Sequence, residues 1–437
     1  MARTADDTRP VVSILTLGCK LNQSDSEAIA RRLAGEGVRV TDRPARGAQA
    51  VVINTCSVTH VADRKARHMV RLARRLSPAS QIVLTGCYAE TAPADIAEIT
   101  GADVVLRNAD KPLIAERLLE RLAARGDPAG GCPTHLRNGL RTRAFIKIQE
   151  GCNELCAFCI VPYTRGREVS VPIERVVEQV QARETEGVVE VVLTGTQLGN
   201  YGRDLGWPEQ GPRRLLEALL EQTSVRRIRL SSLQAQDIHL DLMRLWKDPR
   251  LCPHFHLPLQ SGSDRVLSAM RRRYTAAQYL ASVEAIRANA PDVAITTDVI
   301  AGFPGETEED FQSTLDVCRE AGFAAMHCFP YSKRPHTGAE KMAGHLAPEV
   351  RRERLERLLE VARETSERFR RAQLGATMDV LWEQESGGRW QGLTGNYIRV
   401  YTAANDDLTN QLLPARLEGL ESEGMRGTVA VTETASL

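Results

Sequence analysis

The regular alternation of short apolar runs with amphipathic segments constrains the fold of this chain more than any other feature. In the first part of the chain, strands are predicted over 11–17, 50–54, 81–85 and 103–106, and helices over 24–36, 61–76 and 112–125. The strand segments are continuous Val, Ile and Leu runs, which are typical of strands buried on both faces. We therefore expect an α/β domain with a parallel sheet. Ser24 or Asp25 is predicted to cap the first helix.

A second strand–helix series follows residues 125–133, whose Gly and Pro content predicts a linker. Its strands are predicted over 144–149, 188–194, 227–231, 255–258, 294–300 and 326–329, with helices that include 173–186 and 276–289. Five or six βα units favour a full or partial (β/α) barrel. The charged segment 348–373 carries apolar residues at helical spacing and predicts a packed connector helix.

The end of the chain changes character. Four β-rich pieces, TMDVLWEQ, RWQGLTG, YIRVYT and RGTVAVTE, are separated by Gly, Asn and Asp, which predicts a small all-β barrel. The predicted domains are therefore 10–125 (parallel-sheet α/β), 138–372 (barrel with connector helix) and 373–434 (β barrel). The length of 437 residues agrees with about three domains.

Composition excludes several classes of protein. Hydrophobic residues make up 42% and charged residues 26%, as in ordinary globular chains. The sequence contains no run of about 18 apolar residues, so we expect no membrane-spanning helix. The first residues carry acids and lack an apolar core, so we expect no signal peptide and a cytoplasmic location. The net charge of +1 does not predict a nucleic-acid partner, although local patches remain compatible with one.

Three of the ten cysteines stand close together in sequence. Cys152, Cys156 and Cys159 form C-x3-C-x2-C after the predicted strand AFIKIQ. Disulfides are not expected, because the cytoplasm keeps thiols reduced. Three thiolates in one loop predict an iron–sulfur cubane with one iron that lacks a protein ligand and is open to a substrate or cofactor. A zinc site would need a fourth Cys or His at short spacing, and none is near.

A second set of three cysteines is spread over the first domain. Cys19, Cys56 and Cys87 each end an apolar strand of the predicted sheet. Ligands gather at the carboxyl ends of parallel strands, so we expect these thiols to converge and to hold a second cluster. The alternative is that each packs as a small hydrophobic residue. The four remaining cysteines are expected to be structural thiols: Cys132, Cys252, Cys318 and Cys328.

C-x3-C-x2-C at the first strand of a barrel resembles the radical S-adenosylmethionine (SAM) enzymes. A three-cysteine first domain, a radical barrel and a terminal β domain of the TRAM type together resemble the methylthiotransferases, from about Pro10 to Thr432. The resemblance is carried by TLGCKLNQSDSE, NTCSVT, GCYAE, PYTRGREVS, LTGTQLGNYG, HLPLQSGSDRVLSAMRRRY, DVIAGFPGETEEDF and HCFPYSKRPHTGAEKM. Lys20 and FPYSKRP resemble the subgroup that acts on threonylcarbamoyladenosine in tRNA. At the position of Lys20, the isopentenyladenosine enzymes usually have Gln and the ribosomal-protein enzymes usually have Pro.

The resemblance implies a transferase that replaces C2–H of N6-threonylcarbamoyladenosine, at position 37 in the anticodon stem-loop of tRNA, by S–CH3. This carbon is not acidic, so the reaction needs a radical, which a cofactor supplies. The implied cofactors are SAM and two [4Fe-4S] clusters, one held by Cys152, Cys156 and Cys159. The cluster that holds the inserted sulfur is implied at Cys19, Cys56 and Cys87. Implied partners are an electron donor, such as flavodoxin or ferredoxin, and a sulfur donor, with no membrane.

Turns after the predicted barrel strands imply further contacts with SAM. These residues are Gly195, Thr196, Gln197, Gln260, Ser261, Gly302 and Glu306. A threonylcarbamoyl carboxylate would need cations in its pocket, and Lys333 and Arg334 are the candidates. RNA contacts are expected from basic stretches at 64–75, at 271–274 with its tyrosine, and at 165–167, although such stretches are often solvated faces.

The sequence departs from the family pattern in places, and alternatives stay open. Val171 stands where the family usually has Arg, and Gln234 stands where an acid is common. The β domain holds nine acidic residues against four arginines between 379 and 433, which weakens the expectation that it binds RNA by charge.

The alternative functions are methylthiolation of isopentenyladenosine in tRNA, methylthiolation of a ribosomal-protein aspartate, and a non-catalytic iron–sulfur or zinc-binding RNA adaptor.

Overall fold

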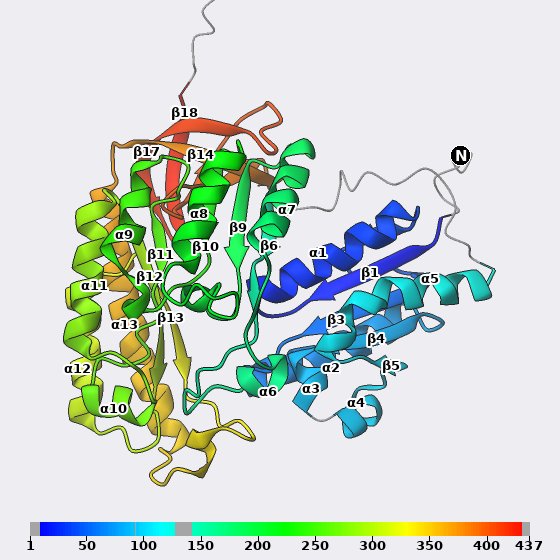
Figure 1. The fold of residues 1–437 in the computed structure, drawn as a ribbon, viewed down its shortest axis with the longest axis horizontal. Coiled ribbons are helices and arrows are strands. Elements are labelled where there is room, and N and C mark those ends of the chain that lie inside the picture. The colour runs from blue at the N-terminus through cyan, green and yellow to red at the C-terminus, as the bar shows by residue number, and fades with distance from the viewer. Residues whose placement is uncertain (1–8, 92, 127–141, 431–437) are drawn as a thin grey trace, which may run out of the picture.

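The computed structural model describes residues 9–91, 93–126 and 142–430 (Figure 1). The first domain is a five-stranded sheet in the order β2-β1-β3-β4-β5, with every pair parallel. Its strands are β1 (Val11–Thr16), β2 (Arg39–Thr41), β3 (Ala50–Thr55), β4 (Gln81–Gly86) and β5 (Val104–Val105). The sequence predicted all of these except the three-residue edge strand β2. Residues 127–133 of the predicted linker, Cys132 among them, lie outside the described residues.

Helices cover both faces of this sheet, as the continuous apolar strands require. They are α1 (Lys20–Gly35), α2 (His60–Leu76), α3 (Cys87–Thr91), α4 (Pro93–Thr100), the 3-10 helix η2 (Asn108–Leu113) and α5 (Ile114–Ala124). Leu33 of α1 and Leu118 of α5 pack with Val52 on one face. Val70 of α2 packs with Ile53 on the other face. Every residue of β3 is buried between these two layers.

The predicted cap of the first helix is wrong. Helix α1 begins at Lys20, with Cys19 as its N-cap residue and no side-chain cap. Ser24 and Asp25 instead lie buried inside the helix. The carboxylate of Asp25 pairs with Lys111 at 2.6 Å and with Lys147 at 2.7 Å. Its charge therefore serves a contact between the first domain and the barrel.

The central domain is a partial (β/α) barrel. Its strands are β6 (Arg143–Lys147), β9 (Glu190–Thr194), β10 (Arg227–Leu230), β11 (His254–His256), β12 (Ala294–Ala301) and β13 (Ala325–Pro330). They form two parallel three-stranded sheets, β10-β9-β6 and β11-β12-β13. A single parallel bridge between Ile228 and Leu251 joins the two sheets, so the strands follow one another in chain order.

Helices surround the outside of the barrel. They are α6 (Val161–Arg165), α7 (Ile173–Thr185), α8 (Gly211–Gln222), α9 (Leu240–Met243), α10 (Asp264–Ala269), α11 (Ala276–Asn289) and α12 (Glu308–Ala321), and a small hairpin pairs β7 (Gln149–Glu150) with β8 (Val169–Ser170). Short 3-10 turns are η3 (Leu198–Asn200), η4 (Ala235–Asp237), η5 (Arg244–Lys247) and η6 (Gly338–Lys341). Alternate strand residues pack on the helices in the largest apolar core.

The intervening strand residues point into the interior of the barrel, which we call the lumen. Many of them are polar: Arg143, Lys147, Glu190, Arg229, His254, His256, Thr296, Asp298 and His327. An apolar ligand would not need such a lining. The lumen is therefore a candidate pocket for a polar ligand.

The terminal domain is a closed barrel in the order β14-β15-β16-β18-β17, as predicted. The strands are β14 (Thr377–Ser386), β15 (Arg389–Thr394), β16 (Arg399–Thr402), β17 (Leu412–Glu421) and β18 (Gly424–Val429), and the predicted connector is α13 (Pro348–Ala372). The prediction missed β17, because its sequence LLPARLEGLE contains Pro and alternating charges. No helix of the described ranges is long and apolar enough to span a membrane.

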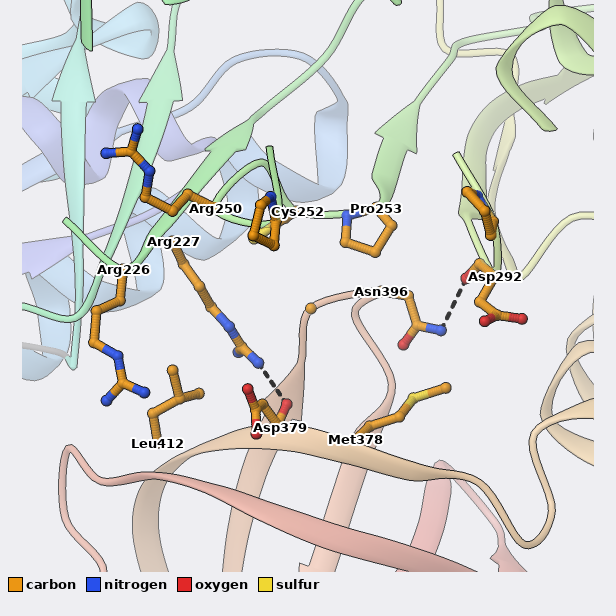
Figure 2. Close-up of a pocket in the computed structure, with 13 residues that line it drawn as sticks. Arg226, Arg227, Arg250, Cys252, Pro253, Asp292, Met378, Asp379, Asn396 and Leu412 are labelled. Atoms are coloured by element: carbon orange, nitrogen blue, oxygen red, sulfur yellow. Dashed lines mark hydrogen bonds between the residues drawn. The ribbon is translucent and has the colours of Figure 1, made fainter. Parts of the chain in front are cut away.

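The β barrel covers the end of the central barrel at which the strands begin (Figure 1). Arg227 donates hydrogen bonds to the carbonyl oxygens of Leu393, at 3.0 Å, and of Asp379 (Figure 2). The Asn396 amide donates to the carbonyl oxygen of Asp292 at 3.0 Å. A pocket of about 390 Å³ lies at this junction. These contacts fasten the two barrels together at the end opposite to the cysteine loop.

Candidate active site

Cys19, Cys56 and Cys87 come together at the carboxyl edge of the first sheet, as the sequence predicted. They directly follow β1, β3 and β4 or lie within three residues of them, and these three strands are neighbours. Burial raises the pKa of Cys56 to about 11, and the nearby Cys87 and Cys19 sulfurs raise it further. Gly18, at φ +99°, permits this approach, because a Cβ there would lie 2.5 Å from the Cβ of Cys56. We call these three cysteines the sheet triad.

Cys152, Cys156 and Cys159 lie in the loop between β7 and α6, and we call them the loop triad. Each sulfur accepts one N–H hydrogen bond. The donors are the backbone of Glu154 for Cys152 at 3.3 Å, the backbone of Val161 for Cys159 at 3.4 Å, and the Arg272 guanidinium for Cys156 at 3.5 Å. Such donors stabilise thiolates that bind a metal. Burial raises the pKa of Cys152 to about 11 and that of Cys159 to about 12.

The donor set of each triad fits an iron–sulfur cluster. Three thiolates are soft ligands, which iron–sulfur clusters take, and a structural zinc site would need a fourth ligand. In the described ranges, His256, Asp298 and His327 are the one set of His, Cys, Asp or Glu ligand atoms found within 4.8 Å of one another.

Helix α6 links the two triads. It begins two residues after Cys159, contacts α3, the helix that starts at Cys87, and ends at Arg165. Figure 1 shows α6 between the central barrel and the first domain. The Arg165 guanidinium donates to Glu150 at 2.6 Å and to the Asn22 side chain. Burial alone would lower the pKa of Arg165, but the Cys87 and Cys19 sulfurs and nearby carboxylates raise it. The two triads thus share a continuous set of contacts.

Arg165 is not a surface contact for RNA, which corrects the prediction for the 165–167 stretch. Its side chain is 3% exposed, because the first domain and the barrel enclose it. The stretch at 271–274 is corrected in part for the same reason: Arg272 points to Cys156, and Tyr274 is buried and donates to the carbonyl oxygen of Pro258 at 2.7 Å. In the predicted 64–75 stretch of α2, the exposed basic residues are Arg64, Lys65, His68, Arg71 and Arg75.

Arg334 is also not free to bind a substrate, which corrects another prediction. Its guanidinium donates to the Asp63 carboxylate at 2.8 Å and to the Ser57 hydroxyl at 2.6 Å. The side chain is 4% exposed and its charge is already paired. Because Ser57 follows Cys56, this ion pair fixes the sheet triad relative to the barrel. Lys333 is exposed and stays a candidate.

The predicted SAM-binding turns lie at the carboxyl ends of barrel strands. After β9, Gly195 is followed by Thr196 and Gln197, whose backbone N–H groups donate to the Gln149 side chain at 2.9 and 3.0 Å. Gln149 lies three residues before Cys152, so this turn is tied to the cysteine loop. Near β12, Gln260 donates its N–H to the carbonyl oxygen of Asp298 at 2.9 Å.

Ser261, Gly302 and Glu306 have partners within the protein. The Ser261 hydroxyl is buried against that of Thr314, at 3.1 Å. The Glu306 carboxylate accepts from the Gly302 N–H at 2.9 Å and from Arg354 of α13 at 2.6 Å. Burial raises the pKa of Glu306, although Arg354 opposes the rise. These contacts tie the turn at Gly302 and Glu306 to α13. The expectation that this turn contacts SAM stays a prediction.

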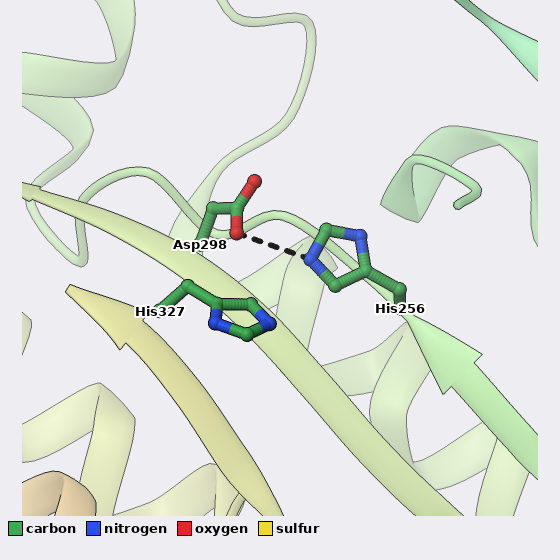
Figure 3. Close-up of side chains that lie close together, drawn as sticks. All are labelled: His256, Asp298 and His327. Carbon is green, nitrogen blue, oxygen red and sulfur yellow. Dashed lines mark hydrogen bonds and ion pairs between the residues drawn. The ribbon is translucent and has the colours of Figure 1, made fainter. Parts of the chain in front are cut away.

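Sequence reasoning missed the polar side chains of the lumen. The His256 imidazole lies 3.2 Å from the Asp298 carboxylate and 3.0 Å from the Ser232 hydroxyl (Figure 3). The His327 ring lies 6.0 Å from the His256 ring. The signal was present as polar residues at alternate positions of HFH, TTD and MHC. These groups can position a polar ligand by hydrogen bonds.

Comparisons with known proteins agree with this geometry. Residues 146–318 match the radical SAM superfamily, and residues 11–107 match the uncharacterized protein family UPF0004. The threonylcarbamoyladenosine tRNA methylthiotransferase MtaB of Bacillus subtilis (strain 168) is 34% identical over 427 residues, which cover 93% of both chains. The tRNA-2-methylthio-N(6)-dimethylallyladenosine synthase of Mycobacterium avium (strain 104) is 39% identical over 418 residues, 90% of this chain and 58% of that one.

Solved structures support the fold. The radical SAM methyltransferase TsrM from Kitasatospora setae superposes with a TM-score of 0.55 at 15% sequence identity. The match covers 76% of this chain and 77% of that one. At this identity the likeness concerns the arrangement of strands and helices alone.

Proposed function

The chain belongs to the radical SAM methylthiotransferases that modify tRNA, and from this premise we propose that it converts N6-threonylcarbamoyladenosine at position 37 into its 2-methylthio form. It is an iron–sulfur transferase that uses SAM. The reaction replaces one hydrogen by S–CH3, with the methyl group from SAM and the sulfur from a sulfur donor. An electron donor such as flavodoxin or ferredoxin and a cytoplasmic location complete the proposal.

The observation that carries the proposal is the convergence of two cysteine triads through α6. The loop triad would hold the [4Fe-4S] cluster that binds SAM, and the sheet triad would hold a second [4Fe-4S] cluster. When bound, these groups supply the radical and sulfur chemistry that an aromatic C–H requires. The chain contributes orientation: N–H donors from Glu154 and Arg272 hold the loop sulfurs, and Arg165 offsets the negative charge of the sheet thiolates.

The turns after the barrel strands would complete the SAM site. Gly195, Thr196 and Gln197 are tied to the cysteine loop through Gln149, and Gln260 has a left-handed backbone, with φ +65°. Such an unusual backbone at a strand end favours a binding role. Their contribution would be to position the amino-acid part of SAM next to the loop triad.

Dimethylallyladenosine in tRNA is the second candidate substrate, because a relative named for it is 39% identical to this chain. The polar lumen opposes it. An apolar substituent gains little from a lumen lined by Lys, Arg and His. A substituent with a carboxylate and a hydroxyl group suits the lumen better.

The proposal is tested with purified, anaerobically reconstituted enzyme, SAM, a reductant and sulfide. Transcripts that carry threonylcarbamoyladenosine or dimethylallyladenosine are offered in competition, with the ribosomal protein as a third substrate. Mass spectrometry of the digested products should show the 2-methylthio derivative of threonylcarbamoyladenosine in excess. Preference for dimethylallyladenosine or for the protein would contradict the assigned substrate.

A further inference from the structure

Lys20 is a cation in the lumen that has no anionic partner. It is the first residue of α1, which packs against β6, and its Nζ lies 5.7 Å from the centre of the Tyr397 ring. The charged side chains that act on it are Arg229, Arg143 and Glu190. In the described part of the chain, no carboxylate lies within 4.0 Å of Nζ and no acceptor is within hydrogen-bonding distance.

The other cations of the lumen do have partners. Arg229 donates to the Glu190 carboxylate at 2.8 Å and to the carbonyl oxygen of Gly395 at 2.8 Å. Arg143 donates to the Glu383 carboxylate at 2.7 Å. His254 stacks on Tyr397 at 4.6 Å, and burial holds the pKa of His254 well below its usual range, so it adds no charge. Lys20 therefore carries a positive charge that no group described in the lumen pairs with, and an anionic ligand would balance this charge.

The position of Lys20 in the chain relates this charge to the reacting atom. Lys20 follows Cys19 of the sheet triad. In adenine, C2 and C6 are both bonded to N1, so a substituent on N6 lies along the same edge of the base as the carbon to be modified. A base placed with C2 toward the sheet triad therefore brings its N6 substituent close to Cys19 and its neighbour.

We propose that Lys20 binds the carboxylate of the N6-threonylcarbamoyl group and thereby selects this substrate. The inference rests on the function proposed above and adds the residue that recognises the substituent. Lys20 is a specificity residue here, because it touches the substituent and not the reacting carbon. It replaces Arg334, whose charge is paired with Asp63.

The test compares two anticodon stem-loop oligonucleotides, one with N6-threonylcarbamoyladenosine and one with its carboxyl methyl ester. The ester removes the charge and nearly keeps the shape. Binding to the holoenzyme is measured by fluorescence anisotropy for the wild type, Lys20→Met, Lys20→Arg and the matched control Lys247→Met, which changes an exposed lysine of η5. Iron content and 5′-deoxyadenosine formation show whether each variant is intact.

The wild type should bind the acid about 10- to 100-fold more tightly than the ester, the range expected for one charged hydrogen bond. The ratio of the two affinities should approach one in Lys20→Met and stay above one in Lys20→Arg. In Lys247→Met it should equal the wild-type ratio. An iron-replete Lys20→Met enzyme that keeps the full preference for the acid would overturn the inference. If Lys20→Met loses iron, the Lys20→Arg variant is used to decide. An iron-replete Lys20→Arg enzyme that no longer prefers the acid over the ester would overturn the inference.

The same samples separate this inference from the proposed function. A wild type that methylthiolates the acid stem-loop but binds acid and ester equally overturns only the role of Lys20. A wild type that does not methylthiolate the acid stem-loop overturns the proposed function, and the role of Lys20 with it.

Discussion

At the scale of single residues, the charged side chains between the first domain and the barrel are the ones on which the site depends. Arg165 is 3% exposed and lies 2.6 Å from Glu150 and 3.7 Å from Asp25. Its removal takes away the buried hydrogen bonds to Glu150 and Asn22, while Asp25 keeps Lys111 and Lys147 and Glu150 keeps Lys147. The loss of buried charged hydrogen bonds is more costly than the loss of a surface pair.

We expect Arg165→Ala to lower the free energy of unfolding by about 1.5 to 3 kcal/mol, the range for a hydrogen bond to a charged group. Denaturant titration of the two purified proteins measures the difference. The control is Arg167→Ala, an exposed arginine two residues away, which should change stability by about 0.5 kcal/mol or less. Equal effects of the two variants would contradict the assigned role of Arg165.

Asp25 gives a prediction about pH. Burial alone would raise the pKa of Asp25, but Lys111, Lys147 and Arg165 outweigh burial and lower it to about 2. A carboxyl whose pKa is lower in the folded than in the unfolded state stabilises the fold above the unfolded pKa of about 3.9. This stability is lost as the pH falls from about 5 to 2. The free energy of unfolding of the cluster-free chain should therefore fall less steeply over this window in Asp25→Asn than in the wild type; identical slopes would refute the assignment.

At the scale of elements, the cysteines depend on tight turns at the ends of strands. Gly86 ends β4 directly before Cys87 and has φ +95°. A Cβ at this position would lie 2.3 Å from the carbonyl oxygen of Thr55. Any side chain here must push β3 and β4 apart and move Cys87 away from Cys56.

We expect Gly86→Ala to lose the sheet-triad cluster, about four of roughly eight iron atoms, while SAM cleavage persists. Iron analysis and 5′-deoxyadenosine assays measure the two effects. Gly101→Ala is the matched control, since Gly101 also has a positive φ (+74°) in the same domain but open space where its Cβ would be. If both variants lose the same amount of iron, the close approach of the strands is not the cause.

The two triads should differ in function. Replacing Cys152, Cys156 and Cys159 by Ala should leave about four iron atoms and abolish 5′-deoxyadenosine formation. Replacing Cys19, Cys56 and Cys87 should keep that cleavage and stop methylthio insertion. Circular dichroism confirms that each triple variant is folded. Methylthiolated product from the second variant would exclude a role of the sheet triad in holding sulfur.

At the scale of the whole molecule, the sequence predicted the architecture and both triads better than it predicted the charged contacts. The triads were visible because Cys19, Cys56 and Cys87 end continuous apolar strands, and parallel topology brings such ends together. The start of α1 was not visible, because Cys19 is not a usual cap residue. Arg165 and Arg334 were misjudged because their burial depends on how two domains pack, which no local pattern encodes.

The central claim is that this molecule inserts a methylthio group into threonylcarbamoyladenosine of tRNA. The most direct measurement is nucleoside mass spectrometry of total tRNA from cells with and without this protein. The account predicts that the 2-methylthio derivative of threonylcarbamoyladenosine disappears without the protein, that its precursor accumulates, and that any 2-methylthio derivative of dimethylallyladenosine is unchanged. Loss of the dimethylallyladenosine derivative instead, with the threonylcarbamoyladenosine derivative intact, would contradict it.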